Sequence, residues 1–317
     1  MNLRSAAQSL LLVAALAGTL LPARAGAEVR AVPVAPQVWF VQGESALGSP
    51  TNRNFISNAG FVVTPGGVVV VDALGAPLLA NELIAAIRRV TTLPIRYVIV
   101  THYHADHVYG LQAFEAIGAR ILAHPAARDY LNSELALQRL QASREELAPW
   151  VDESTRLVAA DRWLNDEQTE LRLGGDRLLI RHVGPAHTTE DLVVYHPASG
   201  SLFTGDLVFR ARIPYVGQAD SRAWIRALDG LLTWSPQRLL PGHGPVAEQP
   251  LADLRLTRDY LQFLRDAMGA AARELEPFDD AYARTDWSRF AGLPLFGVAN
   301  RINAYNTYLL MERETER

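Results

Sequence analysis

The first half of the chain alternates apolar, β-branched runs with segments of helical periodicity. Turn signals, among them the Pro-Gly-Gly of 65–67, separate the runs. Apolar residues that recur every third or fourth position predict helices, and short continuous apolar runs predict buried strands. On this basis we expect strands at 37–43, 54–64, 67–72, 95–101 and 119–124, helices at 77–90 and 108–119, and a mostly helical stretch at 124–150.

The second half of the chain opens with strands that follow one another without intervening helices. A doubly wound parallel sheet needs a helix between consecutive strands, so this run disfavours one. The order favours an α/β fold, α+β in some schemes, in which two sheets pack face to face with helices outside. The strands are expected at 168–175, 177–184, 191–197, 201–206 and 237–244, and helices at 221–233, 251–276 and 300–314.

The two ends of the chain differ from this β-rich middle. Residues 1–27 contain Arg4, an apolar run at 10–21 and small residues in an Ala-x-Ala pattern, which predicts a Sec-type signal peptide. A short membrane anchor is the alternative, but the apolar run is too short to span a bilayer stably. We therefore expect a periplasmic or secreted protein with no stable membrane anchor after cleavage. Its main domain would span 28–248, and a helical extension at 249–317 would pack on it.

Composition narrows the possible partners. The 317 residues carry a formal charge of −4, and they include no basic run. Phosphate binding needs clustered Lys and Arg, so the sequence disfavours nucleic acid and leaves a small molecule as the expected partner. The chain has no Cys, which excludes disulfides, thiolate metal ligands and a thiol nucleophile. Oligomeric state has no signature in the sequence.

Coordinating side chains are crowded into one short stretch after the strand expected at 95–101. His102, His104, Asp106 and His107 fall within six positions. Imidazole and carboxylate are the ligands that zinc takes when no thiolate is available. His102 and His104 can point the same way from an extended segment, while Asp106 and His107 can point towards a second ion. The stretch therefore predicts a metal site.

Three further candidates, His187, Asp206 and His243, follow other expected strands. All of them have a Gly or Pro within two positions and lie at expected strand ends, where side chains from distant parts of the chain can converge. The two oxygens of Asp206 could bridge two cations. A single His in a strand or loop is more often a hydrogen-bonded structural residue, and this is the interpretation we give to His124, His182 and His196.

The crowded stretch is also part of a wider pattern. Residues 101–107, Thr-His-Tyr-His-Ala-Asp-His, resemble the T-H-x-H-x-D-H signature of the metallo-β-lactamase superfamily. GPAHTTED, LFTGDLVF and LLPGHGPV resemble, in order, the later motifs of that superfamily, and VVVVDALG resembles its early strand, which here ends in Asp72. The resemblance runs from about residue 37 to 246. It implies a four-layer αββα sandwich with two metal ions at one edge.

The resemblance also implies a role for each candidate. One zinc would bind His102, His104 and His187, and a second would bind the set Asp106, His107 and His243, with Asp206 bridging the two ions. Asp72 and Thr101 would support the His-rich turn by hydrogen bonds; a simple strand-end cap is the alternative for Asp72. Two zinc ions are the expected cofactors, and iron or manganese is the alternative.

A two-zinc site predicts hydrolysis. Two zinc ions lower the pKa of a shared water, and the resulting hydroxide can attack a carbonyl carbon. We expect hydrolysis of an ester, thioester, lactone or amide-type bond of a small molecule. Asp106 would take the proton and return it to the leaving group. No nucleophile from the protein is needed, which agrees with the absence of Cys.

Asp206 helps to distinguish which branch of the superfamily the chain resembles. True β-lactamases of this superfamily usually carry Cys or Ser at the bridging position, so β-lactam hydrolysis is the alternative activity. The stretch 207–229 resembles the quinoprotein relay system zinc metallohydrolases, and FTGDLVF resembles glyoxalase II. Arg212 and Tyr215, soon after Asp206, are candidates for the substrate pocket.

A different class of function is a metal-binding accessory protein or a di-iron redox protein of a periplasmic quinoprotein or sulfur-oxidation system. The di-iron members of the superfamily usually carry Glu where Tyr103 and His104 stand, so His104 favours zinc.

Overall fold

Two β-sheets form the frame of the protein. The computed structural model describes residues 28–247 and 249–315, so the predicted signal peptide at 1–27 lies outside the described residues. In the first sheet, β1 to β4 pair antiparallel and β4 to β7 pair parallel, in chain order. Its strands are β1 (Val32–Ala35), β2 (Val38–Val41), β3 (Ala59–Thr64), β4 (Gly67–Val71), β5 (Ile95–Ile99), β6 (Arg120–Ala123) and β7 (Arg162–Trp163).

The second sheet has the order β12-β11-β10-β9-β8. Its strands β8 to β11 are antiparallel neighbours, whereas β11 and β12 run parallel. Helix α6 connects β11 to β12, as a parallel pair requires. The strands are β8 (Gln168–Leu173), β9 (Asp176–His182), β10 (Leu192–His196), β11 (Ser201–Phe209) and β12 (Arg238–His243).

Three hydrophobic layers hold the sheets and helices together. In β4, Val69 and Val71 face the second sheet and pack near Phe203, while Val68 and Val70 face the opposite way. This alternation follows from the two-residue period of a strand, which buries both faces of a central strand. A separate apolar cluster joins the outer face of the second sheet to the later helices. The protein is therefore the four-layer αββα sandwich that the sequence predicted.

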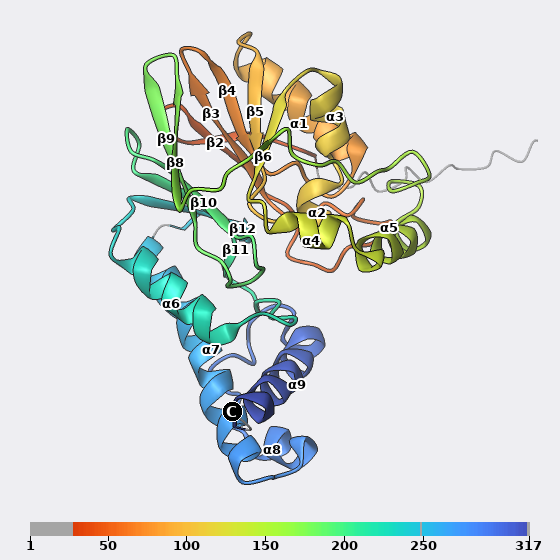
Figure 1. Cartoon of the computed structure of the whole chain (residues 1–317), viewed down its shortest axis with the longest axis vertical. Helices are drawn as coiled ribbons and strands as arrows, with labels where there is room; N and C mark the ends of the chain where they lie inside the picture. The colour runs from red at the N-terminus through yellow and green to blue at the C-terminus, as the bar shows by residue number, and fades with distance from the viewer. Residues whose placement is uncertain (1–27, 248, 316–317) are drawn as a thin grey trace, which may run out of the picture.

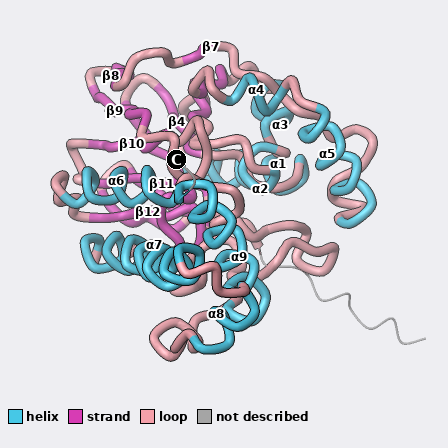
Figure 2. The backbone as a smooth tube through the Cα atoms, turned by 60° about the horizontal axis from the view of Figure 1, so that its bottom comes forward, coloured by secondary structure: helices cyan, strands magenta, loops and turns pink. Residues whose placement is uncertain are grey.

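The helices lie outside the sheets in two sets. Figure 2 shows the first set, α1 to α5, apart from the second set, α6 to α9. The first set is α1 (Pro77–Val90), α2 (Ala105–Val108), α3 (Leu111–Ala116), α4 (Ala127–Leu131) and α5 (Glu134–Glu146). The second is α6 (Ser221–Leu232), α7 (Pro250–Arg273), α8 (Phe278–Arg284) and α9 (Phe296–Thr315).

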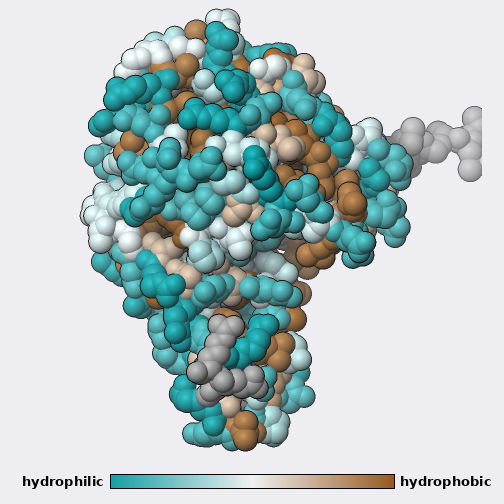
Figure 3. Space-filling model, in the orientation of Figure 1, coloured by the Kyte–Doolittle hydropathy of each residue, from teal (hydrophilic) through white to brown (hydrophobic). Residues whose placement is uncertain are grey.

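The C-terminal helices extend the sandwich on one side. Helix α7 packs on α6 and α9, and α8 lies at the far end from the sheets (Figure 1). Side chains of α7 and α9 share one apolar cluster with Leu207 and Trp224. The face in Figure 3 is mainly hydrophilic, with hydrophobic residues in separate patches. Among residues 28–247 and 249–315, no helix combines the length and the apolar character that crossing a membrane requires.

Three local expectations were wrong. The strand expected at 54–64 begins at Ala59, because Asn54 adopts a left-handed conformation and its backbone N–H donates to the side chain of Asn52. The strand expected to end at Asp206 continues to Phe209, because β12 runs beside it and pairs Phe209 with His243. The helix expected at 108–119 is shortened to α3 at Leu111–Ala116, and a separate short helix, α2, covers Ala105–Val108; between them the N–H of Gly110 donates to the carbonyl of Leu74. Strands β1 and β7 were not predicted, whereas α8 lies within the extension that was expected to be helical.

Candidate metal centre

The seven side chains expected to bind metal converge at one edge of the sandwich. They come from the turn after β5, the loop between β9 and β10, the strand β11 and the end of β12. They form two groups, and within each group one potential ligand atom per residue lies within 4.8 Å of the others. The first group is His102, His104, His187 and Asp206, and the second is Asp106, His107 and His243.

Asp206 lies between the two groups. Its Oδ2 is 3.6 Å from Nε2 of His187 in the first group and 3.2 Å from Nε2 of His243 in the second. Its Oδ1 is 3.2 Å from Nε2 of His107. A carboxylate in this position faces both groups at once. The bridging position was expected for Asp206, although the expected location at a strand end was wrong.

Asp72 connects the end of β4 to the His-rich turn. Its Oδ1 accepts a hydrogen bond from the backbone N–H of Thr101 at 2.8 Å, and its Oδ2 accepts one from Oγ1 of Thr101 at 2.8 Å. Nδ1 of His107 lies 2.9 Å from the same Oδ2. Because an ionised carboxylate only accepts hydrogen bonds, Nδ1 of His107 carries a proton, and once Nε2 gives up its own proton the lone pair on Nε2 faces the site.

The same reasoning assigns the tautomers of His102 and His243. The hydroxyl of Thr101 has one proton and donates it to Asp72, so it accepts a hydrogen bond from Nδ1 of His102 at 3.0 Å. Nδ1 of His243 donates to the carbonyl oxygen of Ile56 at 2.8 Å. In both rings the remaining Nε2 lone pair faces the site. Orientation of an imidazole through its second nitrogen is typical of histidines that bind metal.

The donor atoms fit a metal ion. Within the described residues, Nε2 of His102, Nε2 of His107 and Oδ1 of Asp206 are enclosed and make no hydrogen bond. An enclosed polar atom without a partner is costly, so several together indicate a missing partner. Nδ1 of His104 and Nε2 of His187 are 3.0 Å apart and point into the same space. Nitrogen and oxygen donors at these positions suit zinc.

Burial and neighbouring charges lower the pKa of His102 and His187 and raise the pKa of His107. Burial, together with the adjacent His104, lowers the pKa of His187 to about 3. Burial and His107 hold the pKa of His102 well below its usual value. Burial also acts to lower the pKa of His107, but three surrounding carboxylates outweigh it and raise that pKa well above its usual value. A bound cation would take the place of the proton that these carboxylates hold on His107.

Two glycines make room for the carboxylate of Asp206 and for Thr101. A Cβ on Gly242, in β12, would overlap Oδ1 of Asp206. Gly205 has a φ of +50°, and a Cβ there would lie 2.6 Å from Oγ1 of Thr101. Gly242 is therefore required by the close approach of Asp206 on the neighbouring strand β11, and Gly205 by the close approach of Thr101 from the first sheet.

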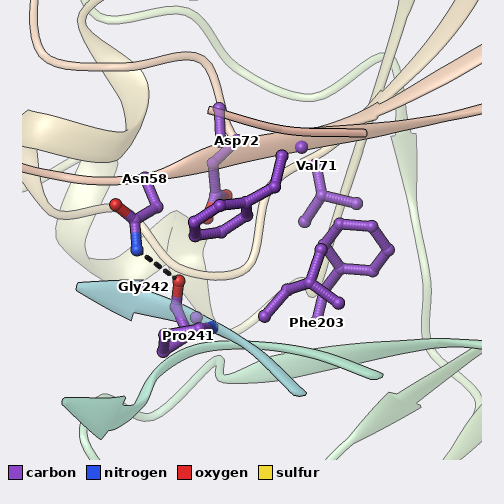
Figure 4. A pocket seen from close by; sticks show the side chains of 11 residues that line it. Asn58, Val71, Asp72, Phe203, Pro241 and Gly242 are labelled. Atoms are coloured by element: carbon purple, nitrogen blue, oxygen red, sulfur yellow. Dashed lines mark hydrogen bonds between the residues drawn. The ribbon is translucent and has the colours of Figure 1, made fainter. Parts of the chain in front are cut away.

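The loop before β3 supports the site and was not predicted. Nδ2 of Asn58 donates to the carbonyl oxygens of Pro241 and Gly244, both at 2.8 Å, on either side of His243. Figure 4 shows Asn58 reaching from the first sheet to Pro241 in the second, beside a cavity of about 10 Å³, enough for one water at most. Ser57 donates to the carbonyl oxygen of Asp106. The signal in the sequence was the polar pair Ser-Asn inside an otherwise apolar run.

Glu190 is a second residue that the sequence did not indicate. Its Oε1 accepts a hydrogen bond from the backbone N–H of Tyr103 at 3.1 Å, and its Oε2 accepts one from Oγ1 of Thr189 at 2.9 Å. Glu190 therefore ties the loop of His187 to the segment between His102 and His104. Its place in GPAHTTED, three residues after a candidate ligand, was the available signal.

The other three histidines lie outside both groups. The rings of His124 and His182 stack in parallel with centroids 3.5 Å apart, and this stack joins the end of β6 to the end of β9. His196 is buried between Ser199 and Asp176, at 2.7 Å and 3.1 Å. These contacts are structural, as the sequence led us to expect.

Arg212 and Tyr215 lie on the loop between β11 and α6, at opposite ends of the site. Nη1 of Arg212 is 3.3 Å from Nδ1 of His243. The ring of Tyr215 is half exposed, and its centroid is 6.5 Å from that of His104. The N–H of Ile213 donates to the carbonyl oxygen of Pro294 at 3.0 Å, so the C-terminal region holds this loop.

Two relatives are similar to this chain over about two thirds of its length. A linear primary-alkylsulfatase of Pseudomonas sp. is 22% identical over 239 residues, which cover 65% of this chain and 45% of that protein, so the chain spans less than half of that relative. A metallo-β-lactamase type 2 of Bacillus sp. is 30% identical over 219 residues, 68% of this chain and 76% of the lactamase.

Solved structures give the same two resemblances. A metallo-β-lactamase from Pontibacter korlensis has a TM-score of 0.57 and 22% identity, and it covers 74% of this chain and 98% of its own. A stereoselective inverting sec-alkylsulfatase from Pseudomonas sp. has a TM-score of 0.71 and 18% identity, and it covers 89% of this chain and 50% of its own. At these identities the likeness shows a shared fold.

A match to the sequence profile of a protein family shows which family the chain belongs to. Residues 52–243, more than half of the chain, match the sequence profile of the metallo-β-lactamase superfamily. This range contains all seven converging side chains and Asp72. Together with the fold and with the 30% identical lactamase, the match shows that this chain belongs to the metallo-β-lactamase superfamily.

Proposed function

We propose that the protein is a hydrolase that uses two zinc ions to cleave an ester, thioester, lactone or amide-type bond of a small molecule. The relatives named above, metallo-β-lactamases and an alkylsulfatase, support hydrolysis. The observation that carries the proposal is the position of Asp206 between two groups of nitrogen and oxygen donors.

The bound ions would supply Lewis acidity and an activated water. The chain would hold the first ion with His102, His104 and His187 and the second with the set Asp106, His107 and His243, with Asp206 between them. Asp72, Thr101 and Ile56 would keep the imidazoles in the tautomers that leave a lone pair for the metal.

Asp106 is the residue to which we assign proton transfer. Its Oδ2 is 3.3 Å from Nε2 of His243 and 3.7 Å from Nε2 of His107. Burial acts to raise the pKa of Asp106, but these two histidines outweigh burial and hold that pKa below its usual value. The carboxylate therefore stays ionised, the form needed to accept a proton from water and pass it to the leaving group.

A sulfate ester is the second candidate substrate. The sec-alkylsulfatase structure covers 89% of this chain, whereas the lactamase structure covers 74%. β-Lactam hydrolysis is supported by the 30% identical lactamase, but Asp206 stands where such enzymes usually carry Cys or Ser. The sequence of residues 207–229 resembles the quinoprotein relay system zinc metallohydrolases and supports that branch of the superfamily.

A substrate panel combined with metal analysis tests the proposal. Zinc-loaded protein would be assayed with an aryl ester, a thioester, a lactone, a β-lactam and an alkyl sulfate, and the metal content of the purified protein would be measured. We expect about two zinc ions per chain and turnover of at least one compound. Iron with a visible absorption band would support a redox protein, and zinc without any turnover would support the accessory role.

We also propose that the protein is exported and then cleaved near residue 27. Arg4, the apolar run at 10–21 and the Ala-x-Ala pattern support export. N-terminal sequencing of protein from the periplasmic fraction should find a chain that begins close to Glu28. An intact N-terminus at Met1 would contradict cleavage.

A further inference from the structure

Glu190 is a buried carboxylate beside the first group of metal-binding side chains. Only 5% of its surface is exposed. It follows His187 by three positions, and its Oε1 accepts a hydrogen bond from the backbone N–H of Tyr103 at 3.1 Å. Tyr103 stands between His102 and His104 in the sequence. Glu190 therefore belongs to one of the two segments that supply the imidazoles of the first group, and it is bonded to the other.

The chain supplies no cation to balance this carboxylate. The ion pairs among the described residues join other carboxylates to Arg or His, and none of them includes Glu190. Its Oε2 accepts a hydrogen bond from Oγ1 of Thr189 at 2.9 Å. Both oxygens thus accept from neutral donors, as an ionised carboxylate does. A buried charge without a partner of opposite charge is costly, so its presence needs an explanation.

A hydrogen-bonded tie alone would not require a charge at this position. The loop of Glu190 is closed by Asp191, which accepts from the backbone N–H and from Oγ1 of Thr188, both at 2.8 Å. The backbone N–H of Leu192 donates to the carbonyl oxygen of Thr101 at 2.9 Å, which joins the same two segments. A glutamine could make both bonds of Glu190, because its oxygen accepts and its NH2 group can donate to a hydroxyl. The negative charge is therefore the property that remains to be explained.

The carboxylates near the two groups are unevenly distributed. The second group contains Asp106, and Asp72 lies 2.9 Å from Nδ1 of His107 in that group. The first group contains three imidazoles and Asp206, which it shares with the second. Neutral imidazoles do not balance the charge of a divalent cation, so a further negative charge near the first group would stabilise an ion there. Glu190 adjoins the segments of those imidazoles and carries such a charge.

We propose that Glu190 is a positioning residue whose negative charge holds the first of the two metal ions, the one bound by three imidazoles. The inference rests on the proposed function, because it concerns the metal ions of that same site. The charge is unfavourable in the metal-free protein and becomes favourable once a cation lies beside it. Removal of the charge should therefore weaken the first ion and spare the second, which has Asp106 as a ligand of its own.

Thermal unfolding of Glu190→Gln with and without zinc tests the role of the charge. The amide keeps the size of the side chain and can keep both hydrogen bonds, so the charge is the main loss. In chelator-treated protein we expect the variant to melt at the same temperature as the wild type or higher, because an unpaired buried charge has been removed. In zinc-loaded protein we expect the variant to melt at the lower temperature, because it binds the first ion more weakly. A residue that only ties two segments together would lower both melting temperatures.

Competition with a chromophoric chelator measures the affinity for each zinc ion. For Glu190→Gln we expect one of the two affinities to fall by about tenfold to hundredfold, and the other to change by less than about threefold. Glu167→Gln is the control, because it removes one charge from an exposed residue that pairs with Arg181 at the surface. This control should leave both affinities unchanged, since an exposed charge is screened by solvent and salt.

Variants that keep one site identify which ion is weakened. His243→Ala removes a ligand of the second ion, and His187→Ala removes a ligand of the first. Addition of Glu190→Gln should lower the zinc affinity of the His243→Ala protein, which keeps the first site, and not that of the His187→Ala protein. The reverse pattern would overturn the proposal. A metal-free Glu190→Gln protein that melts below the wild type, or that does not fold, would overturn it as well.

These measurements separate the role of Glu190 from the proposed function. Binding of two zinc ions without turnover of any substrate would leave the role of Glu190 intact and remove the hydrolase. Turnover by the wild type, together with equal zinc affinities for the wild type and Glu190→Gln, would keep the hydrolase and overturn the role of Glu190. A wild-type chain that binds no zinc would overturn both.

Discussion

Asn303 in α9 holds the backbone of Val216 in the loop that carries Arg212 and Tyr215. Oδ1 of Asn303 accepts a hydrogen bond from the N–H of Val216 at 3.0 Å, and its Nδ2 donates to the carbonyl oxygen of Pro214 at 2.7 Å. Asn303 is fully buried, and Nδ2 also lies 3.0 Å from the hydroxyl of Tyr260 in α7. The C-terminal helices therefore determine the conformation of a loop at the edge of the metal centre.

Asn303→Asp should loosen this loop. A carboxylate keeps the volume of the side chain but cannot donate to Pro214, so two oxygens would face each other. We expect a loss of about 1–3 kcal/mol in the free energy of unfolding and a rise in KM that exceeds the fall in kcat. Urea unfolding and steady-state kinetics measure the two effects. Asn300→Asp, which removes the donation from Nδ2 of Asn300 to the hydroxyl of Tyr282 without touching the loop, should lower stability and leave KM unchanged. Equal KM values for Asn303→Asp and the wild type would contradict the positioning role.

Asp72→Asn should weaken metal binding without removing a metal ligand. The amide nitrogen of Asn cannot accept hydrogen bonds, so the new side chain cannot serve Thr101 and His107 together. We expect the affinity for zinc to fall by about tenfold to hundredfold, measured by competition with a chromophoric chelator. Asp176→Asn breaks a comparable contact with the remote His196 and should leave zinc affinity unchanged. If both variants bound zinc like the wild type, Asp72 would be only a strand-end cap.

The metal-free protein should lose stability as the pH falls. Burial lowers the pKa of His187 to about 3 in the folded chain, whereas in the unfolded chain the pKa is about 6.5. Between these values the unfolded chain binds the extra proton, so the free energy of unfolding decreases with decreasing pH. His187→Asn should reduce this slope by up to about 1.4 kcal/mol per pH unit. Urea unfolding of chelator-treated protein, from about pH 4 to 6, measures it. Parallel slopes for the two proteins would show that His187 titrates normally.

Gly242→Ala should damage both stability and metal binding. The added methyl group would overlap the carboxylate of Asp206 and force it away from the donors around it. Overpacking of this kind costs about 1–3 kcal/mol, and the zinc content should drop with it. Gly230→Ala in α6 is the matched control, because nothing lies within 4 Å of the new methyl group. That control should stabilise the protein by about 0.5–1 kcal/mol, as alanine does in a helix.

Residues whose signal is local could be predicted from the sequence. His102, His104 and His107 stand out because polar, coordinating side chains directly follow an apolar strand. The three apolar layers also follow from local patterns. Strand β4 is apolar at every position, and a strand of that kind is buried on both faces.

Residues whose role depends on distant partners could not be predicted. Asn58 acts on Pro241, which is 183 positions away, and Ile56 orients His243 across 187 positions. Asn303 is one polar residue among several in α9, and only the packing of that helix brings it to Val216. Asp206 was placed at a strand end because the continuation of β11 depends on pairing with β12.

The distance along the chain between Ile56 and His243 has a consequence for the order of events in the life of the protein. The turn at 102–107 and the loop that orients His243 are synthesised early, whereas His243 itself belongs to the final strand of the sandwich. Neither half of the chain contains all the donor side chains of either group. The loop between them must therefore close, at a cost in chain entropy, before a metal ion can stabilise the fold. The proposed metal ions would therefore bind late, after the two sheets associate, and a chain that crosses a membrane unfolded would acquire them on the far side.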